Sequence, residues 1–275
     1  MQKRGFKYCQ IAAYTILVCV SALFGCRGKQ NTTDSTADSS ASPANRGEQI
    51  VAEFLKRDAA AFRKARVRFT VKTDGDPDKI YEIDTWRKQT SDTTTTLSQI
   101  IKPEEDSDLA SLTTEATGRK TTVVTYIASR GEFRETDTNK MFFGGLTAGE
   151  LLGEWGKFVY SLKGEKDAGG KKAFEVEGKL KDGMTSVVSR MTVLFRSDTY
   201  VPDELHLFDN NGREIRTYKT TEFNDDPAHP YAVKTEVENP IYKAHIVIEI
   251  LSREFPDTLD DSMFSRDKLK QIVRK

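Results

Sequence analysis

An Asn-Gly turn between two alternating segments constrains this chain more than any other feature. In residues 191–196 every second side chain (Met191, Val193, Phe195) is apolar, as in a β-strand with one face on a core. Residues 204–208 follow after a Pro break, and Asn211-Gly212 then leads into residues 213–218. Asn and Gly tolerate the positive φ angles of tight hairpin turns. The sequence therefore predicts an antiparallel hairpin within a longer run of strands over 171–254.

The rest of the chain after residue 46 predicts one mainly β domain. Further strands are expected from alternation and β-branched residues at 67–71, 79–87, 93–101, 121–128 and 244–251. Helical spacing of apolar residues precedes the first strand, over 50–62. The pattern Thr147-Ala-Gly-Glu150 is a capping box that opens a helix with an apolar face reaching Leu162, and Ser265 can cap a last short helix. We therefore expect a single domain over 47–275.

The N-terminal region has the pattern of a bacterial lipoprotein signal. A basic start precedes an apolar stretch over 11–20, which is short for a membrane span of about 20 residues, and Leu23-Phe-Gly-Cys26 resembles a lipobox. We expect residues 1–25 to be a signal peptide and Cys26 to be lipidated. Residues 26–46 are polar and form a disordered tether in this interpretation. A plain signal peptide or an uncleaved anchor is the alternative.

Composition and motifs favour binding over catalysis. The chain has 42 Lys and Arg residues and 42 Asp and Glu residues, so no net charge favours nucleic acid as a partner. His206, His229 and His245 have no second His or Cys at metal-ligand spacing, and no nucleophile elbow or phosphate loop is found. Cys26 would be the one mature cysteine, which leaves no internal disulfide. We expect no enzyme activity, no catalytic or metal-binding residue and no cofactor.

The order of these segments resembles the LolA-like branch of the outer-membrane lipoprotein-sorting family. The resemblance rests on Leu194–Pro202, the Asp209–Gly212 turn, Thr235–Pro240 and Asp261–Phe264, and it covers roughly residues 49–273. It implies a LolA/LolB-like fold, a half-open antiparallel β-barrel of about 10 to 11 strands covered by a few helices. An arginine on the first strand is important in the soluble carriers of the family. Arg66 and Arg68 both fit that place with opposite facing, so the role is carried to neither.

The resemblance also implies a function and a set of site residues. The lipobox predicts an envelope lipoprotein anchored through Cys26 with its domain in the periplasm, which departs from the soluble carriers of the family, because these are not acylated. Arg27 stands where an acidic residue retains many lipoproteins at the inner membrane, which favours the outer membrane. The resemblance itself predicts an acyl-chain carrier. Such a protein binds acyl chains of lipids or lipoproteins and takes part in lipoprotein sorting to the outer membrane, with envelope lipoprotein-export components as possible partners. A protein-interaction module with a filled barrel is the alternative. The cavity and lid residues are then Phe69, Val71, Trp86, Phe143, Leu151, Trp155, Phe158, Met191, Val193 and Phe195. An ordinary covering helix is the alternative to the lid.

Overall fold

The structure is a computed structural model that describes residues 42–57, 60–116, 119 and 121–273. The predicted signal peptide, the lipobox with Cys26 and most of the tether lie outside the described residues. The first described helix, α1 (Pro43–Arg57), begins inside the predicted tether. Within the described ranges, no helix has both the length and the apolar character needed to cross a membrane.

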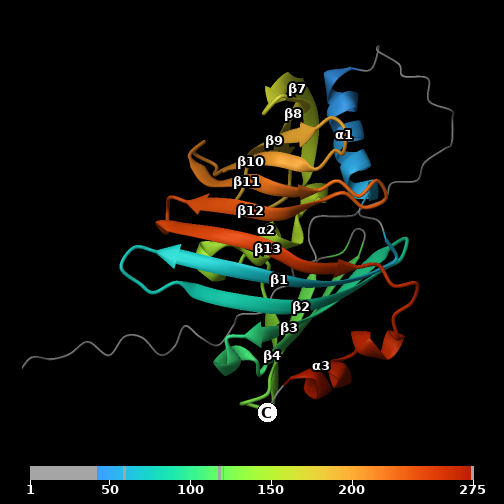
Figure 1. The fold of residues 1–275 in the computed structure, drawn as a ribbon, viewed down its shortest axis with the longest axis vertical. Coiled ribbons are helices and arrows are strands. Elements are labelled where there is room, and N and C mark those ends of the chain that lie inside the picture. The colour runs from blue at the N-terminus through green and yellow to red at the C-terminus, as the bar shows by residue number, and fades with distance from the viewer. Residues whose placement is uncertain (1–41, 58–59, 117–118, 120, 274–275) are drawn as a thin grey trace, which may run out of the picture.

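The chain forms one antiparallel sheet of thirteen strands, in the order β6-β5-β4-β3-β2-β1-β13-β12-β11-β10-β9-β8-β7 (Figure 1). The first six strands extend to one side, the next seven return from the far edge, and β13 pairs with β1 in the centre. The strands are β1 (Phe62–Thr73), β2 (Lys79–Gln89), β3 (Thr93–Lys102), β4 (Leu109–Ala116), β5 (Thr122–Ile127), β6 (Glu132–Thr136), β7 (Phe158–Ala168), β8 (Lys171–Leu180), β9 (Arg190–Arg196), β10 (Pro202–Phe208), β11 (Glu214–Asn224), β12 (Tyr231–Asn239) and β13 (Ala244–Glu254).

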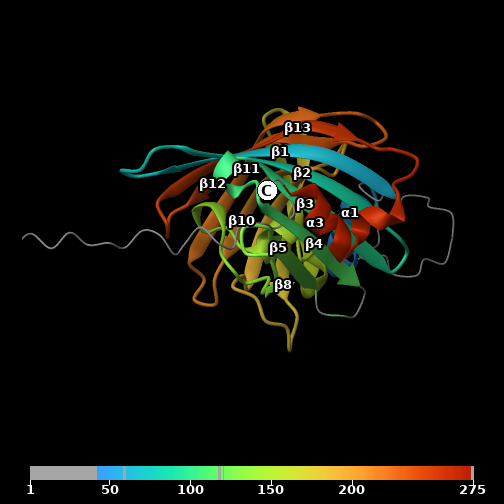
Figure 2. The same ribbon diagram turned by 90° about the horizontal axis from the view of Figure 1, so that it is seen from below.

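The sheet curls until its two ends lie below the central strands. Figure 2 shows β1 and β13 at the top of the curve, with β5 and β8 lower in the view. This is the mainly β, half-open architecture that the sequence predicts. The sheet has thirteen strands, more than the 10 to 11 that the resemblance implies, and β4, β6 and β7 lie where the sequence predicts no strand.

The predicted hairpin is confirmed as β10 and β11. Leu205 pairs with Tyr218 and Leu207 with Arg216, and Gly212 adopts a φ of 74° in the turn. The Asp209 carboxylate accepts hydrogen bonds from the backbone N–H groups of Asn211 (2.9 Å) and Arg213 (3.0 Å). The turn is therefore fixed by its own side chains, as Asp and Asn turns commonly are.

The sheet carries two hydrophobic cores. The first lies on β1 to β5 with parts of β12 and β13, and it extends to the outer face, where it includes Leu97, Ala110 and Leu269. The second lies on the inner face, under α1 on β7 to β11. The predicted inward phase is confirmed at both, since Phe69, Val71, Met191, Val193 and Phe195 are buried. On the outer face, helix α3 (Arg266–Ile272) covers β4 and β5.

The segment between β6 and β7 lies inside the curve of the sheet and fills the first core. It contains the 3₁₀ turn η2 (Phe143–Gly145), the helix α2 (Ala148–Leu152) and the 3₁₀ turn η3 (Trp155–Lys157). The Phe143 ring lies 4.9 Å from that of Phe69 and 4.4 Å from that of Tyr81. We call residues 141–157 the plug.

The plug corrects the prediction of one long helix up to Leu162. The capping box is present, with Thr147 Oγ1 accepting from the Glu150 N–H at 3.1 Å, but α2 ends at Leu152. Gly153 follows in the left-handed conformation with a φ of 59°, which ends the helix. Phe158 and Leu162 belong to β7, so Leu151, Trp155 and Phe158 do not form one helical stripe.

Candidate functional site

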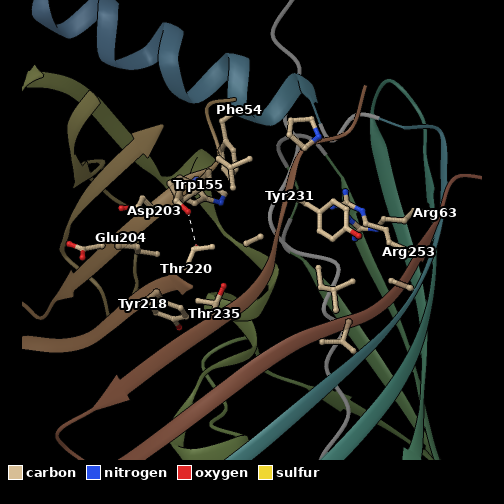
Figure 3. A pocket seen from close by; sticks show the side chains of 18 residues that line it. Phe54, Arg63, Trp155, Asp203, Glu204, Tyr218, Thr220, Tyr231, Thr235 and Arg253 are labelled. Atoms are coloured by element: carbon tan, nitrogen blue, oxygen red, sulfur yellow. Dashed lines mark hydrogen bonds between the residues drawn. The ribbon is translucent and has the colours of Figure 1, made fainter. Parts of the chain in front are cut away.

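A cavity lies between the two hydrophobic cores, on the inner face of the central strands. Its volume is about 100 Å³, and the cleft around it holds about 820 Å³ when counted out to open solvent. Strands β1 and β10 to β13 form the walls, and α1 and η3 contribute Phe54 and Trp155 on one side (Figure 3). Most lining side chains are apolar: Phe54, Ala65, Val67, Trp155, Val201, Pro202, Leu205, Pro230, Ala232 and Ile250.

Phe54 and Trp155 form an aromatic wall that is held from the second core. Their rings meet edge to face at 5.2 Å, and each lies against Phe195, at 5.3 Å from Phe54 and 6.1 Å from Trp155. The indole Nε1 of Trp155 is buried, and it has no hydrogen-bond acceptor within the described ranges. A buried donor without an acceptor is costly. A ligand oxygen or a water that reached the indole N–H would therefore bind favourably.

The opposite wall carries two arginines, Arg63 on β1 and Arg253 on β13. Figure 3 shows both beside Tyr231 and across the cavity from Phe54 and Trp155. The Arg253 guanidinium lies over the rings of Tyr231 at 4.5 Å and Phe255 at 5.0 Å. Burial lowers the pKa of Arg253 to about 10 and, with the nearby charge of Arg87, lowers that of Arg63 well below its usual value. Both stay protonated at neutral pH, as arginines do in proteins.

A β-bulge explains why Arg253 faces inward. Val67 pairs with Ile250 and Arg66 pairs with Ser252, so Leu251 is an extra residue on β13. Simple alternation from Ile250 would place Ser252 inside and Arg253 outside. The bulge shifts the phase, so that Arg253 pairs with the inward residue Ala65.

One acidic side chain, Asp203, lies at the β10 wall of the cavity. Asp203 sits at an irregularity in the β9–β10 pairing, and burial, followed by the charge of Glu204, raises its pKa. In Figure 3, Asp203 and Glu204 lie on the side away from Arg63 and Arg253. Thr220 Oγ1 lies between these walls and donates to the Pro202 carbonyl at 2.9 Å. The Glu204 side chain is in the outward phase of β10, where its carboxylate lies 3.5 Å from Lys219 Nζ. The cavity is therefore apolar in its middle, with two basic residues at one wall and Asp203 at the other.

The predicted cavity and lid residues divide between the cavity and the cores. Trp155 lines the cavity. Phe69, Val71, Phe143 and Leu151 are buried in the first core, and Phe158, Met191, Val193 and Phe195 are buried in the second. Their role in lipid binding stays a prediction.

Trp86 has a different position, on the outer face of β2. It pairs with Leu97, and Gln99 on the same face of β3 donates to the Ile272 carbonyl of α3 at 2.7 Å. Trp86 therefore packs on the side of the sheet that α3 covers. In the part of the chain that the structure describes, no group of three or more His, Cys, Asp or Glu side chains is arranged to hold a metal ion.

Comparison with solved structures identifies the class of fold. A DUF1329 family protein from Desulfovibrio piger matches with a TM-score of 0.78 and 16% identity, over 83% of this chain and 100% of that one. An outer membrane lipoprotein-sorting protein domain from Vibrio parahaemolyticus matches with a TM-score of 0.74 and 15% identity, over 82% and 99%. A LolA superfamily protein from Nitrosomonas europaea gives 0.65 and 12%, over 81% and 98%. The chain therefore has a LolA-like fold.

The sequence can also be assigned to a protein family. A family model described as "Uncharacterized protein" matches residues 92–271, which is more than half of the chain, and the chain belongs to that family. No curated protein matches the sequence.

Proposed function

We propose that this protein is a lipid-anchored envelope protein that binds acyl chains of lipids or lipoproteins in the central cavity and takes part in lipoprotein sorting. It acts in this proposal as a binding protein and not as an enzyme, held through Cys26 with the domain in the periplasm. The observation that carries the proposal is a largely apolar cavity that remains open between two packed cores. The similarity to a lipoprotein-sorting domain supports it.

The size of the cavity sets what it binds without rearrangement. A water molecule occupies about 30 Å³ in the liquid, so a cavity of about 100 Å³ accepts only a short part of a chain. Each buried CH₂ group contributes about 0.8 kcal/mol. A longer chain requires the wall of Phe54 and Trp155 to move away from β12 and β13. Binding and release are then shifts between a narrow and a wide state.

Trp155 provides the test of this proposal. The chain has two tryptophans, so Trp86→Phe leaves Trp155 as the sole reporter inside the cleft. Titration with a diacylated lipopeptide should shift the Trp155 emission and saturate, because an acyl chain changes the surroundings of the indole. The same peptide without acyl chains is the control. Native mass spectrometry of the purified protein should also detect retained lipid.

A second candidate function follows from the way the plug fills part of the concave side of the sheet. The plug occupies the first core with its own side chains, among them Phe142, Phe143 and Leu146. A protein-interaction module with a filled interior would have this arrangement. The absence of both a saturable Trp155 response and a copurified lipid would favour that module over the carrier.

A further inference from the structure

The two cavity arginines form part of a row of guanidinium groups on the inner face of the sheet. Arg63 pairs directly with Arg87 across β1 and β2, and on its other side Ala65, two residues along β1, pairs with Arg253. Residues placed diagonally on neighbouring strands are about 7–8 Å apart, within reach of long side chains. Arg63 and Arg87 are 6% and 1% exposed, whereas Arg253 is only partly buried. The row thus runs from the interior to the accessible side of the cavity.

Arg253 is held in a geometry suited to a planar anion. The rings of Tyr231 and Phe255 lie at 4.5 and 5.0 Å from its guanidinium carbon, which limits the rotation of the side chain. The guanidinium fork matches carboxylate and phosphate oxygens in a bidentate manner, and such bonds are stronger in an apolar setting than in water. Pre-ordering reduces the entropy that is lost on binding.

The charges of the two walls orient an amphiphile in the cavity. Asp203 repels a negative head group from the β10 wall, while Arg63 and Arg253 attract it to the β1 and β13 wall. The apolar surface between the walls, including Val67 and Ile250, then contacts the start of the acyl chain. A neutral lipid gains only the apolar part of this interaction.

We infer that the cavity selects amphiphiles with a negatively charged head group, a carboxylate or a phosphate, that is bound by Arg63 and Arg253 with the acyl chain directed towards Phe54 and Trp155. This rests on the proposed function and adds the class of ligand. Carboxylate and phosphate share the chemistry that the two arginines recognise, so the two sources are separated by experiment.

Three probes that share an oleyl or oleoyl chain test the inference: oleate, 1-oleoyl lysophosphatidate and oleyl alcohol. Binding is measured below the micelle concentration through Trp155 emission in the Trp86→Phe protein. At least one anionic probe should bind about tenfold or more tightly than oleyl alcohol, as one charge-assisted contact provides. The tighter of the two anionic probes identifies the head group. Arg253→Gln should bring the ratio close to one, because it removes the guanidinium fork that distinguishes the anionic probes from the alcohol.

Two variants serve as controls for charge and position. Arg66 lies on the same strand as Arg63 but on the outer face, where it pairs with Asp84 at 2.6 Å, so Arg66→Gln should keep the full preference. Arg253→Lys keeps the charge without the fork and should keep a reduced preference. Urea unfolding of each variant verifies the fold. If Arg63→Gln does not fold, Arg253→Gln carries the test, because Arg253 is partly exposed.

The outcomes separate this inference from the proposed function. Equal binding of all three probes to the Trp86→Phe protein would overturn the inference and leave the acyl-chain carrier intact. A preference that persists in Arg253→Gln and in the folded Arg63→Gln variant would also overturn it. Failure of oleyl alcohol and both anionic probes to bind would instead contradict the proposed function. Competition of inorganic phosphate with lysophosphatidate would support a phosphate-binding head group site.

Discussion

Glu115 on β4 is a carboxylate whose surroundings oppose its ionisation. Burial raises the pKa of Glu115 to about 7, the charges of Arg87 and Arg63 lower it, and that of Glu154 raises it further. Arg87 is 1% exposed, and burial lowers its pKa to about 10. The inner face near β2 to β4 therefore holds charged groups in a setting that disfavours charge.

This pKa predicts how stability depends on pH. Between the ordinary value of 4.5 and the folded value of about 7, Glu115 binds a proton in the folded protein and not in the unfolded one. The free energy of unfolding should therefore fall as pH rises through this window and stay level above it, by up to about 3 kcal/mol from this group. Urea unfolding at pH 4.5, 6 and 8 measures the fall.

Glu115→Gln should remove this part of the pH dependence. An exposed carboxylate on β6, two strands from β4, offers the control: Glu135→Gln should keep the slope of the unmodified protein. An identical slope in Glu115→Gln and the unmodified protein would show that Glu115 ionises normally in the fold.

Individual residues show which parts of the fold and the site can be predicted from the sequence. Period two correctly predicts that Met191, Val193 and Phe195 are buried, because β9 has an unbroken alternation. Alternation does not identify Arg253 as an inward residue, because the bulge at Leu251 shifts the inward and outward positions of β13 by one residue. The sequence around Leu251 does not specify a bulge. Arg63 lies between the helical spacing predicted over 50–62 and the first strand predicted at 67–71, so it was assigned to neither.

Helix α1 packs closely against strand β7 at Gly47. Gly47 is buried in α1, and a Cβ built on it would lie 2.6 Å from the backbone of Ser161 on β7. The helix can therefore approach the strand closely only without a side chain at this position. Since α1 also carries Phe54, this contact helps to fix the aromatic wall of the cavity.

Gly47→Ala should destabilise the protein although alanine favours helices. The gain in helix propensity of about 1 kcal/mol should be outweighed by overpacking, which costs about 1–3 kcal/mol or more when a backbone must move. Ala52 is exposed on the same helix, so Ala52→Gly should cost only the propensity term. Urea unfolding compares the two, and an unchanged or raised stability of Gly47→Ala would contradict the close contact.

The end of the plug and the start of β7 show that the apolar spacing of a helix and that of a strand can overlap in one segment. Residues 151–162 have apolar spacing suited to a helix, but Phe158, Tyr160 and Leu162 also alternate as in a strand, and the strand forms. Gly153 and Gly156 weaken a helix between them. The capping box correctly predicted where α2 starts, whereas its end depended on pairing with β8, which local sequence does not specify.

At the scale of the whole molecule, two cores share one continuous sheet. Tyr218 packs against both cores, and ten residue pairs join β1 to β13 between the halves. Separating the halves would expose both central strands and the walls of the cavity. We therefore expect the two halves to unfold together.

The two tryptophans test this cooperativity, because Trp86 packs against the first core and Trp155 belongs to the second. Trp86→Phe and Trp155→Phe each leave one reporter. In each variant, the urea midpoint followed by the remaining tryptophan should coincide with the midpoint followed by circular dichroism. A tryptophan signal that changes before the circular dichroism would mean that the half it reports on unfolds independently.

The place of the cavity in the sheet links ligand size to the curvature of the whole fold. Arg63 and Arg253 are carried by the central strands, whereas Phe54 and Trp155 are attached at the β7 end. Neighbouring strands are rotated by about 20–25°, and a change of about 1° at each of the seven interfaces from β1 to β7 would sum to about 7° between these two walls. The width of the cavity therefore depends on the curvature of this half of the sheet. We expect it to respond to substitutions on β7 to β13 that change this curvature, including positions that never touch a ligand.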